Sequence, residues 1–203
     1  MRSVLRNPWI YNVAQRCMGT TRSRQELVNR YVQPHPGDKV LDVGCGTASI
    51  LEHLGDVSYT GFDPTPGYIQ AACATYGQRG AFFVGRIGEV SSAELPTFDV
   101  VLAKGVLHHL DDRLAKELFG LAAAVLEPGG RLVTFDGCYS AGQSGLARFI
   151  ISRDRGQNVR TADAYEALAR TAFEDVQVHV RDDLLRVPYT HAILVCHRPA
   201  RAA

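Results

Sequence analysis

Short apolar segments typical of strands alternate with helical patterns along most of the chain, and this alternation restricts the possible folds more than any other feature. The strand patterns are KVLDV, VSYTGF, AFFVG, FDVVLA and RLVTFD. Helical patterns cover residues 8–17, 24–32, 47–54, 66–76, 111–126 and 161–171. Strands joined through helices pair in parallel by right-handed crossovers, with helices on both faces of the sheet. The sequence therefore predicts a doubly wound, mostly parallel α/β sheet.

The end of the chain departs from this alternation. FEDVQVHVRDD and YTHAILVCHR are strand patterns joined by a short connection, so they should pair as an antiparallel hairpin. With them the predicted sheet has seven strands. The 203 residues suit a single domain over 1–203. Within it we expect residues 1–33 to form a helical lid and residues 137–160 to form an insertion at the carboxyl edge of the sheet.

Charge and cysteine usage limit the partners. The 22 Lys and Arg against 21 Asp and Glu give a net charge of +1, which provides no broad basic field for nucleic acid or anionic lipid. The five cysteines are odd in number and isolated in the sequence, which favours reduced thiols and argues against a metal site. No apolar run is long enough to cross a bilayer. We expect a cytoplasmic protein, monomeric or homodimeric, with no nucleic acid or membrane partner.

Two glycines follow the first strand of the predicted sheet. Gly44 and Gly46 flank Cys45 where a buried strand ends and a helical pattern begins. Glycines there permit a tight turn, and they also let a ligand lie against the backbone. A dinucleotide fingerprint, Gly-x-Gly-x-x-Gly or Ala, would place a third small residue three positions after Gly46, where this chain has Ser49. Asp42 adds a negative charge that favours a cationic group over a pyrophosphate.

Asp63 ends the second strand, beside Pro64. At the same edge as the glycines, its carboxylate can accept hydrogen bonds from both hydroxyls of a ribose. The alternative is that it caps the helix beginning near Pro66.

VLDVGCGT, GFDPT, FDVVLAKGVLHHLDD and LEPGGRLVTFD, in this order, resemble the motifs of class I S-adenosylmethionine-dependent methyltransferases, a Rossmann-like family. The resemblance covers about residues 38–136 and the terminal hairpin. It implies S-adenosylmethionine as cofactor and S-adenosylhomocysteine as product. Many relatives carry Asp after the third strand to bind the adenine amine, whereas this chain has Arg86, so backbone groups of Arg86 and Ile87 are expected there instead. The implied cofactor-binding residues are Asp42, Gly44, Cys45, Gly46, Asp63, Pro64, Arg86, Ile87, Ala103 and Lys104.

LAKGVLHHLDD is also similar to the lysine-x-x-x-histidine stretch of plant-type phenolic O-methyltransferases. That similarity places Lys104 beside the cofactor and makes His108 the candidate general base. An imidazole with a pKa of about 6.5 is suited to removing a phenol or enol proton. The alternative is that the histidines pack behind the cofactor.

The acceptor site must come from outside the shared core. Its candidate residues are Tyr11, Tyr139, Arg153, Arg155 and His191. The basic run SRDRGQNVR either is a solvated loop or binds a carboxylate or phosphate of the substrate. We expect methylation of a small molecule, at oxygen. Transfer to nitrogen or carbon, a macromolecular methyltransferase, an NAD-type oxidoreductase and a non-catalytic cofactor-binding subunit are the alternatives.

Overall fold

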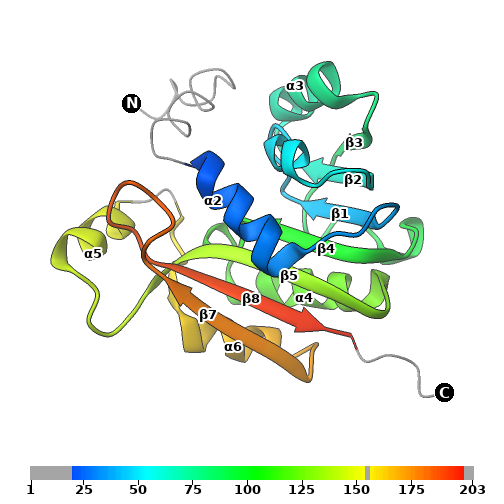
Figure 1. Ribbon diagram of the computed structural model, residues 1–203. Coiled ribbons are helices and arrows are strands. Elements are labelled where there is room, and N and C mark those ends of the chain that lie inside the picture. The colour runs from blue at the N-terminus through cyan, green and yellow to red at the C-terminus, as the bar shows by residue number, and fades with distance from the viewer. Residues whose placement is uncertain (1–19, 154–155, 199–203) are drawn as a thin grey trace.

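The computed structural model describes residues 20–153 and 156–198, which form a single twisted sheet with helices on both faces (Figure 1). The strand order is β3-β2-β1-β4-β5-β8-β7, and a short strand, β6, pairs with β5. β1 to β5 are parallel, whereas β8 is antiparallel to both β5 and β7. The strands are β1 Lys39–Val43, β2 Ser58–Asp63, β3 Gly80–Val84, β4 Phe98–Lys104, β5 Leu126–Tyr139, β6 Arg160–Thr161, β7 Asp175–Arg181 and β8 His191–His197. The predicted fold class is confirmed, and β6 adds a strand of two residues.

Helices on the two faces enclose two apolar clusters. The helical elements are α2 Thr20–Leu27, the π-helix η2 Val28–Val32, η3 Ser49–His53, α3 Pro66–Tyr76, η4 Ser92–Glu94, η5 Leu107–His109, α4 Asp112–Val125, α5 Gly145–Ser152 and α6 Ala162–Ala169. On one face Leu27 and Val32 pack with Ile193 of β8. On the other, Phe119 of α4 and Tyr165 of α6 lie fully buried against the sheet. In Figure 1, α2 accordingly crosses in front of the sheet, with α4 and α6 behind it.

The helix predicted over residues 47–54 is wrong in type and extent. The chain forms only a short 3-10 helix at Ser49–His53. Gly46 and Ala48 both have positive φ, at 56° and 54°, so the turn after β1 extends to residue 48 and shortens the helix. The helix predicted over residues 66–76 is confirmed with both ends as expected. The helix predicted over residues 8–17 lies outside the described residues.

Two other segments differ from expectation. The strand predicted over RLVTFD begins earlier, at Leu126, so EPGG lies within β5, and a register shift against β4 accommodates these residues. Residues 137–160, predicted as a long insertion, begin as a continuation of β5 to Tyr139 and then form α5. β5 therefore projects beyond the carboxyl end of β4, which pairs with it only as far as Phe135.

The carboxyl ends of the parallel strands bring separate motifs to one edge. β1 leads directly into the glycine turn, β2 ends at Asp63, and β4 ends at Lys104. Asp136 and Gly137 follow on β5, next to the start of β8 at His191. This edge therefore gathers residues that are up to about 150 positions apart in sequence. Within residues 20–153 and 156–198, no helix is long and apolar enough to cross a membrane.

Candidate active site

The two glycines of the turn after β1 meet different surroundings. Gly44 has a φ of 69°, and a Cβ there would lie 2.6 Å from a methyl carbon of Val106. Gly46 has a φ of 56°, and a Cβ there would have no described atom within 4 Å. The amides of Gly44 and Cys45 donate to the carbonyl oxygen of Phe62, at 2.8 and 3.0 Å. Gly44 is thus required for packing, while Gly46 leaves bare backbone beside open space.

Asp63 links this turn to the start of α3. Its Oδ2 accepts a hydrogen bond from the amide of Gly46 at 3.1 Å, and its Oδ1 accepts one from the amide of Thr65 at 2.8 Å. Thr65 is the N-cap residue of α3, so the carboxylate does support the helix entry. A carboxylate has about four acceptor positions, so capacity for two further donors remains. The two roles considered from the sequence are compatible.

Asp42 lies behind the turn, 3% exposed. Its Oδ2 accepts a hydrogen bond of 2.5 Å from the hydroxyl of Tyr59. Burial raises the pKa of Asp42 to about 7, although the Tyr59 hydroxyl and the nearby Lys104 favour its ionised form. Burial likewise lowers the pKa of Lys104 to about 8, and its Nζ lies 5.5 Å from the centre of the Phe135 ring. This edge therefore holds a buried acid and a half-buried amine of perturbed acidity.

The other residues of the predicted cofactor set occupy varied environments. Arg86 is exposed and Ile87 is half-buried. The amide of Gly85 donates to the carbonyl oxygen of Asp63 at 3.2 Å, which holds the segment after β3 beside the end of β2. Ala103 is fully buried in the core of β4. Pro64 is exposed, and burial raises the pKa of the Cys45 thiol.

His108 forms a pair with Asp136, a residue that the sequence reasoning did not select. The His108 Nδ1 lies 2.7 Å from Asp136 Oδ1, and the His108 amide donates to the same oxygen at 3.2 Å. Both residues are buried, at 8% and 1% exposed. With Nδ1–H directed at the carboxylate, Nε2 becomes the ring nitrogen that can take up a proton. The sequence feature that could have indicated Asp136 is its position at the end of the strand pattern RLVTFD, which forms the strand next to β4.

The segment after α5 holds this pair in place. Arg160 donates to the carbonyl oxygens of Leu107 and Leu110 on either side of the histidines, at 3.0 and 2.8 Å. It also forms an ion pair of 2.7 Å with Asp112. A Cβ at Gly156 would overlap the His108 ring and lie 2.6 Å from the His108 carbonyl oxygen. Arg160 is therefore engaged within the protein, and Gly156 covers one edge of the imidazole.

The predicted acceptor residues fall into two groups. His191 is 4% exposed, and its ring centroid lies 4.3 Å from that of Phe135 and 4.7 Å from that of Tyr189. Tyr139 instead lies under Arg148 of α5, whose guanidinium carbon is 5.1 Å from the ring centre. Arg153 stacks on Phe149 of the same helix, at 5.0 Å. Tyr11 and Arg155 lie outside the described residues.

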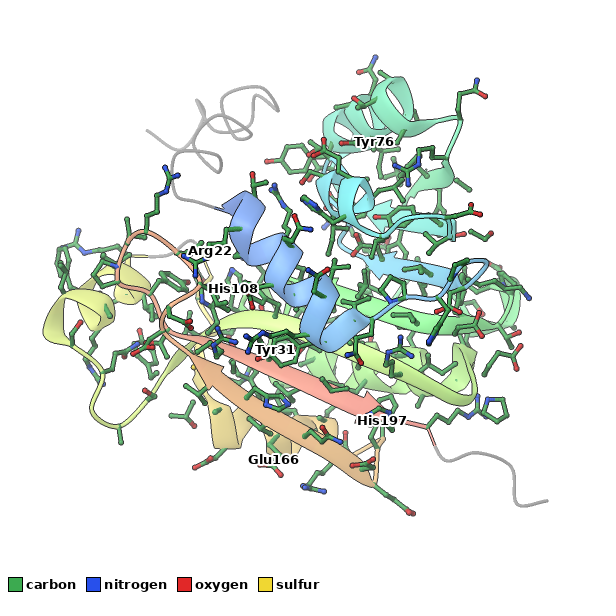
Figure 2. The ribbon with its side chains drawn as sticks, viewed as in Figure 1. Arg22, Tyr31, Tyr76, His108, Glu166 and His197 are labelled. Atoms are coloured by element: carbon green, nitrogen blue, oxygen red, sulfur yellow. The ribbon has the colours of Figure 1, made fainter. Side chains whose placement is uncertain are left out.

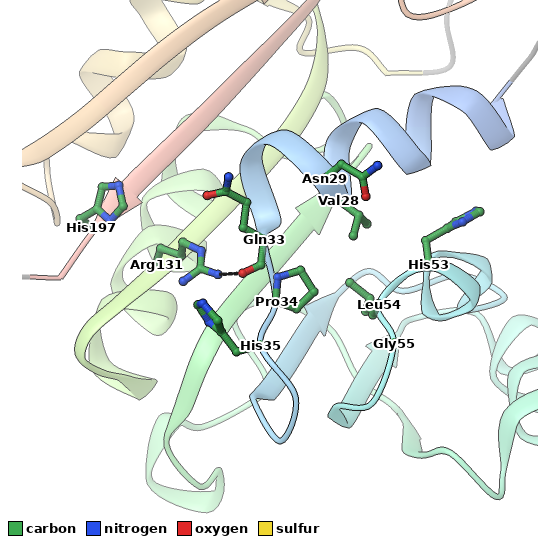
Figure 3. A pocket seen from close by; sticks show the side chains of 10 residues that line it. All are labelled: Val28, Asn29, Gln33, Pro34, His35, His53, Leu54, Gly55, Arg131 and His197. Atoms are coloured by element: carbon green, nitrogen blue, oxygen red, sulfur yellow. Dashed lines mark hydrogen bonds between the residues drawn. The ribbon is translucent and has the colours of Figure 1, made fainter.

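A cavity of about 680 Å³ lies at the edge of the sheet opposite the glycine turn. It includes His35, Arg131 and His197, and Arg131 donates there to the carbonyl oxygens of Val32 and Gln33 (Figure 3). Figure 2 shows His197 on the side of the molecule away from His108. Arg131 thus satisfies the last carbonyls of η2, and this cavity is separate from the glycine turn.

Within the described residues, no group of three or more His, Cys, Asp or Glu side chains is arranged to hold a metal ion.

Known proteins share both the sequence motifs and the fold. A family model described as a methyltransferase domain matches residues 41–132. Phosphoethanolamine N-methyltransferase of Triticum aestivum is 28% identical over 154 residues, which cover 73% of this chain and 30% of that protein. An O-methyltransferase of Pyrenophora dematioidea is 34% identical over 135 residues, covering 60% of this chain and 49% of that protein. The chain thus spans less than half of the length of either relative.

A solved structure supports the fold assignment. Phosphoethanolamine N-methyltransferase 2 of Haemonchus contortus, in complex with phosphomonomethylethanolamine and S-adenosylhomocysteine, superposes with a TM-score of 0.70 at 15% identity. The match covers 87% of this chain and 52% of that chain. At this identity the likeness concerns the fold alone.

Proposed function

We propose that the chain, which carries a methyltransferase domain, is a class I S-adenosylmethionine-dependent methyltransferase that transfers a methyl group to an oxygen of a small-molecule acceptor. The observation that carries the proposal is the juxtaposition of two features at one sheet edge. One is a glycine turn beside open space, and the other is the buried pair of His108 and Asp136.

The residues of the first feature fit the cofactor. Bare backbone at Gly46 accommodates a ligand without a side chain in the way. Asp63 has acceptor capacity for the ribose hydroxyls, and its position is fixed by the amides of Gly46 and Thr65. Above its raised pKa of about 7, the carboxylate of Asp42 favours a cation at this edge. S-adenosylmethionine supplies an activated methyl group on a positively charged sulfur.

The His–Asp pair supports general-base assistance. Asp136 orients the imidazole through Nδ1 and stabilises the imidazolium that forms when Nε2 takes the proton of an acceptor hydroxyl. With S-adenosylmethionine bound, the sulfonium would supply the methyl group to the acceptor oxygen and leave as S-adenosylhomocysteine, and His108 would hold the acceptor's proton and release it to solvent. Most of the acceleration would come from alignment, which can lower a barrier by roughly 7–11 kcal/mol.

The choice of oxygen is the finer part of the proposal. The relatives include proteins named as O-methyltransferases and as N-methyltransferases. A buried base with a fixed carboxylate partner favours an acceptor that must lose a proton to become nucleophilic, such as a phenol or enol hydroxyl. A cytoplasmic location, and a monomeric or homodimeric state, remain predictions.

The test is a methyl-transfer assay with radiolabelled S-adenosylmethionine against pools of hydroxylated and amine-bearing metabolites. We expect label in the hydroxylated pool. His108→Ala and Asp136→Asn should bind S-adenosylhomocysteine as the wild type does, yet lose about 10²–10⁴-fold in turnover. His35→Ala, whose side chain is 77% exposed at the opposite edge, is the matched control. The proposal of a base fails if the His108 variant keeps wild-type turnover from about pH 6 to pH 9, and absence of labelled product from both pools refutes the proposed function.

A further inference from the structure

The last strand in the sheet order, β7, has an outer edge that is free for pairing. No strand among residues 20–153 and 156–198 pairs with its outer side, and Figure 1 shows β7 as the outermost strand. Every second residue of such a strand directs its N–H and C=O groups away from the neighbouring strand. β7 therefore presents a row of backbone donors and acceptors along its seven residues.

This strand lacks the features by which proteins usually protect a sheet edge. Its sequence, DVQVHVR, contains no Pro, Gly or Lys, and it pairs with β8 over all seven residues without a bulge. Val180 is 46% exposed. The opposite edge strand, β3, has a comparably exposed valine, Val84, at 54%, but its sequence GAFFV carries no charged residue. β7 is therefore the edge strand whose side chains can specify a partner strand.

The side chains of β7 form a pattern that is complementary to itself. When a second copy of the strand lies antiparallel about a two-fold axis at Val178, opposite charges meet at both ends and valines meet between them. Each residue then faces one that lies on the same side of the sheet, because side chains alternate with a period of two. The pairs across the axis are Asp175 with Arg181, Val176 with Val180, Gln177 with His179, and Val178 with its own copy.

The two charged ends of β7 are placed to pair between copies and not within one copy. Asp175 and Arg181 are six residues apart on the same strand, which is about 20 Å, and Asp175 is exposed. Nε and Nη2 of Arg181 donate to the carboxylate of Asp183, each at 2.7 Å, and Nη1 donates to the Tyr31 hydroxyl at 3.2 Å. A guanidinium has five N–H donors, so two remain for a second carboxylate. The existing bonds hold the Arg181 side chain in one orientation beside the edge.

We propose that β7 pairs with β7 of a second copy of this chain, antiparallel about a two-fold axis at Val178, and that this pairing forms a homodimer with one continuous sheet. Backbone hydrogen bonds and the valine pairs provide the affinity, while the two Asp175–Arg181 pairs fix the register. A register shifted by two residues would set Asp175 opposite Asp183, which are like charges. Because seven residues from each copy make a small interface, the dimer dissociates on dilution through the micromolar range. This inference does not depend on the proposed function.

Sedimentation velocity of the full chain over a series of concentrations measures the dimer, and we expect the mass of two chains at the highest concentrations. Val180→Lys should raise the dissociation constant by about 10-fold or more, because a lysine on an edge strand opposes pairing with a second strand. Val84→Lys, at the exposed valine of the other edge strand, is the matched control and should leave the dissociation constant unchanged. A wild-type chain that stays monomeric up to millimolar concentration overturns the proposal, and so does a dimer that persists unchanged in Val180→Lys.

Asp175→Arg and Arg181→Asp test the register. Each variant sets like charges opposite each other in its own dimer, so each should raise the dissociation constant by about 10-fold or more. Mixed in equal amounts, the two variants restore both opposite-charge pairs and should form a heterodimer with an affinity close to that of the wild type. A mixture that associates no better than the separate variants overturns the register. Thermal unfolding verifies that each variant is folded, and the comparison of Val180→Lys with Val84→Lys tests the pairing without changing Arg181.

Discussion

The substitution Asp42→Asn should stabilise the ligand-free protein near neutral pH. The carboxyl of Asp42 is buried behind the glycine turn, and burial raises its pKa from 3.8 to about 7. Asn has nearly the same shape, and its side-chain oxygen can still accept the hydrogen bond from the Tyr59 hydroxyl. The exchange therefore removes the cost of a buried charge and keeps the packing and the hydrogen bond.

The magnitude follows from the shifted pKa of Asp42. Between about pH 4 and pH 7 the folded state holds a proton that the unfolded state has released, so the free energy of unfolding falls as the pH rises through this window. From about pH 5 to pH 7.5 this fall amounts to roughly 2–3 kcal/mol. Lys104, whose pKa is lowered from 10.5 to about 8, loses its proton above this range. There its contribution makes the free energy of unfolding rise with pH. The two contributions can therefore be measured separately.

Urea unfolding at about pH 5 and pH 7.5, followed by circular dichroism, measures this effect. Between about pH 5 and pH 7.5, the free energy of unfolding of the wild type should fall by roughly 2–3 kcal/mol more than that of Asp42→Asn. Asp56→Asn, at an exposed position, provides the control for a general loss of negative charge. An equal pH dependence of unfolding in wild type and Asp42→Asn would refute the reasoning that burial holds the Asp42 proton.

Three further substitutions test the site. Gly46→Val should leave a folded protein, destabilised by about 1–2 kcal/mol for its positive φ, that no longer binds S-adenosylhomocysteine in calorimetry; retained affinity would show that the open space is not the cofactor site. Gly156→Ala should reduce turnover by at least about ten-fold with cofactor affinity unchanged, because the new methyl group displaces the His108 ring. A crystal structure of the variant with the ring in its original position would contradict this explanation. Arg160→Gln should lower the free energy of unfolding by about 1–3 kcal/mol, measured in urea, since the carbonyls of Leu107 and Leu110 lose their donor; unchanged stability would contradict this role.

The strands and the glycine turn could be predicted because their signals are local. KVLDV reads as a buried strand, and the structure places β1 at the same residues, Lys39–Val43. The prediction of a helix over residues 47–54 was wrong because Ala48 adopts a positive φ, a backbone conformation that the side-chain pattern does not indicate. The position of Asp63 at the carboxyl edge followed from strand order alone, whereas its bonds to two amides depend on how the turn and α3 approach each other.

Long-range pairings were harder to predict. Asp136 is 28 residues from His108, and the contact exists because β4 and β5 are adjacent in the sheet and η5 folds back over the end of β5. Arg160 of the basic run is bonded within the protein and not solvated, and the binding of a substrate anion by this run stays a prediction. Arg160 reaches its partners within the protein because β6, to which it belongs, pairs with β5. β6 has two residues and is too short to leave a sequence pattern.

The two sides of the site are built by different means, and this difference explains which side the sequence describes better. Around Gly46 the turn is held by backbone hydrogen bonds to Phe62 and by the carboxylate of Asp63, so its shape exists before any ligand arrives and depends on a few glycine and aspartate positions. The surroundings of Tyr139, one of the predicted acceptor residues, are instead formed by side chains of α5, with Phe149 largely exposed. Side chains on a short exposed helix can be exchanged with little cost to the fold. The predicted acceptor side can therefore vary in sequence while the turn proposed to bind the cofactor remains the same.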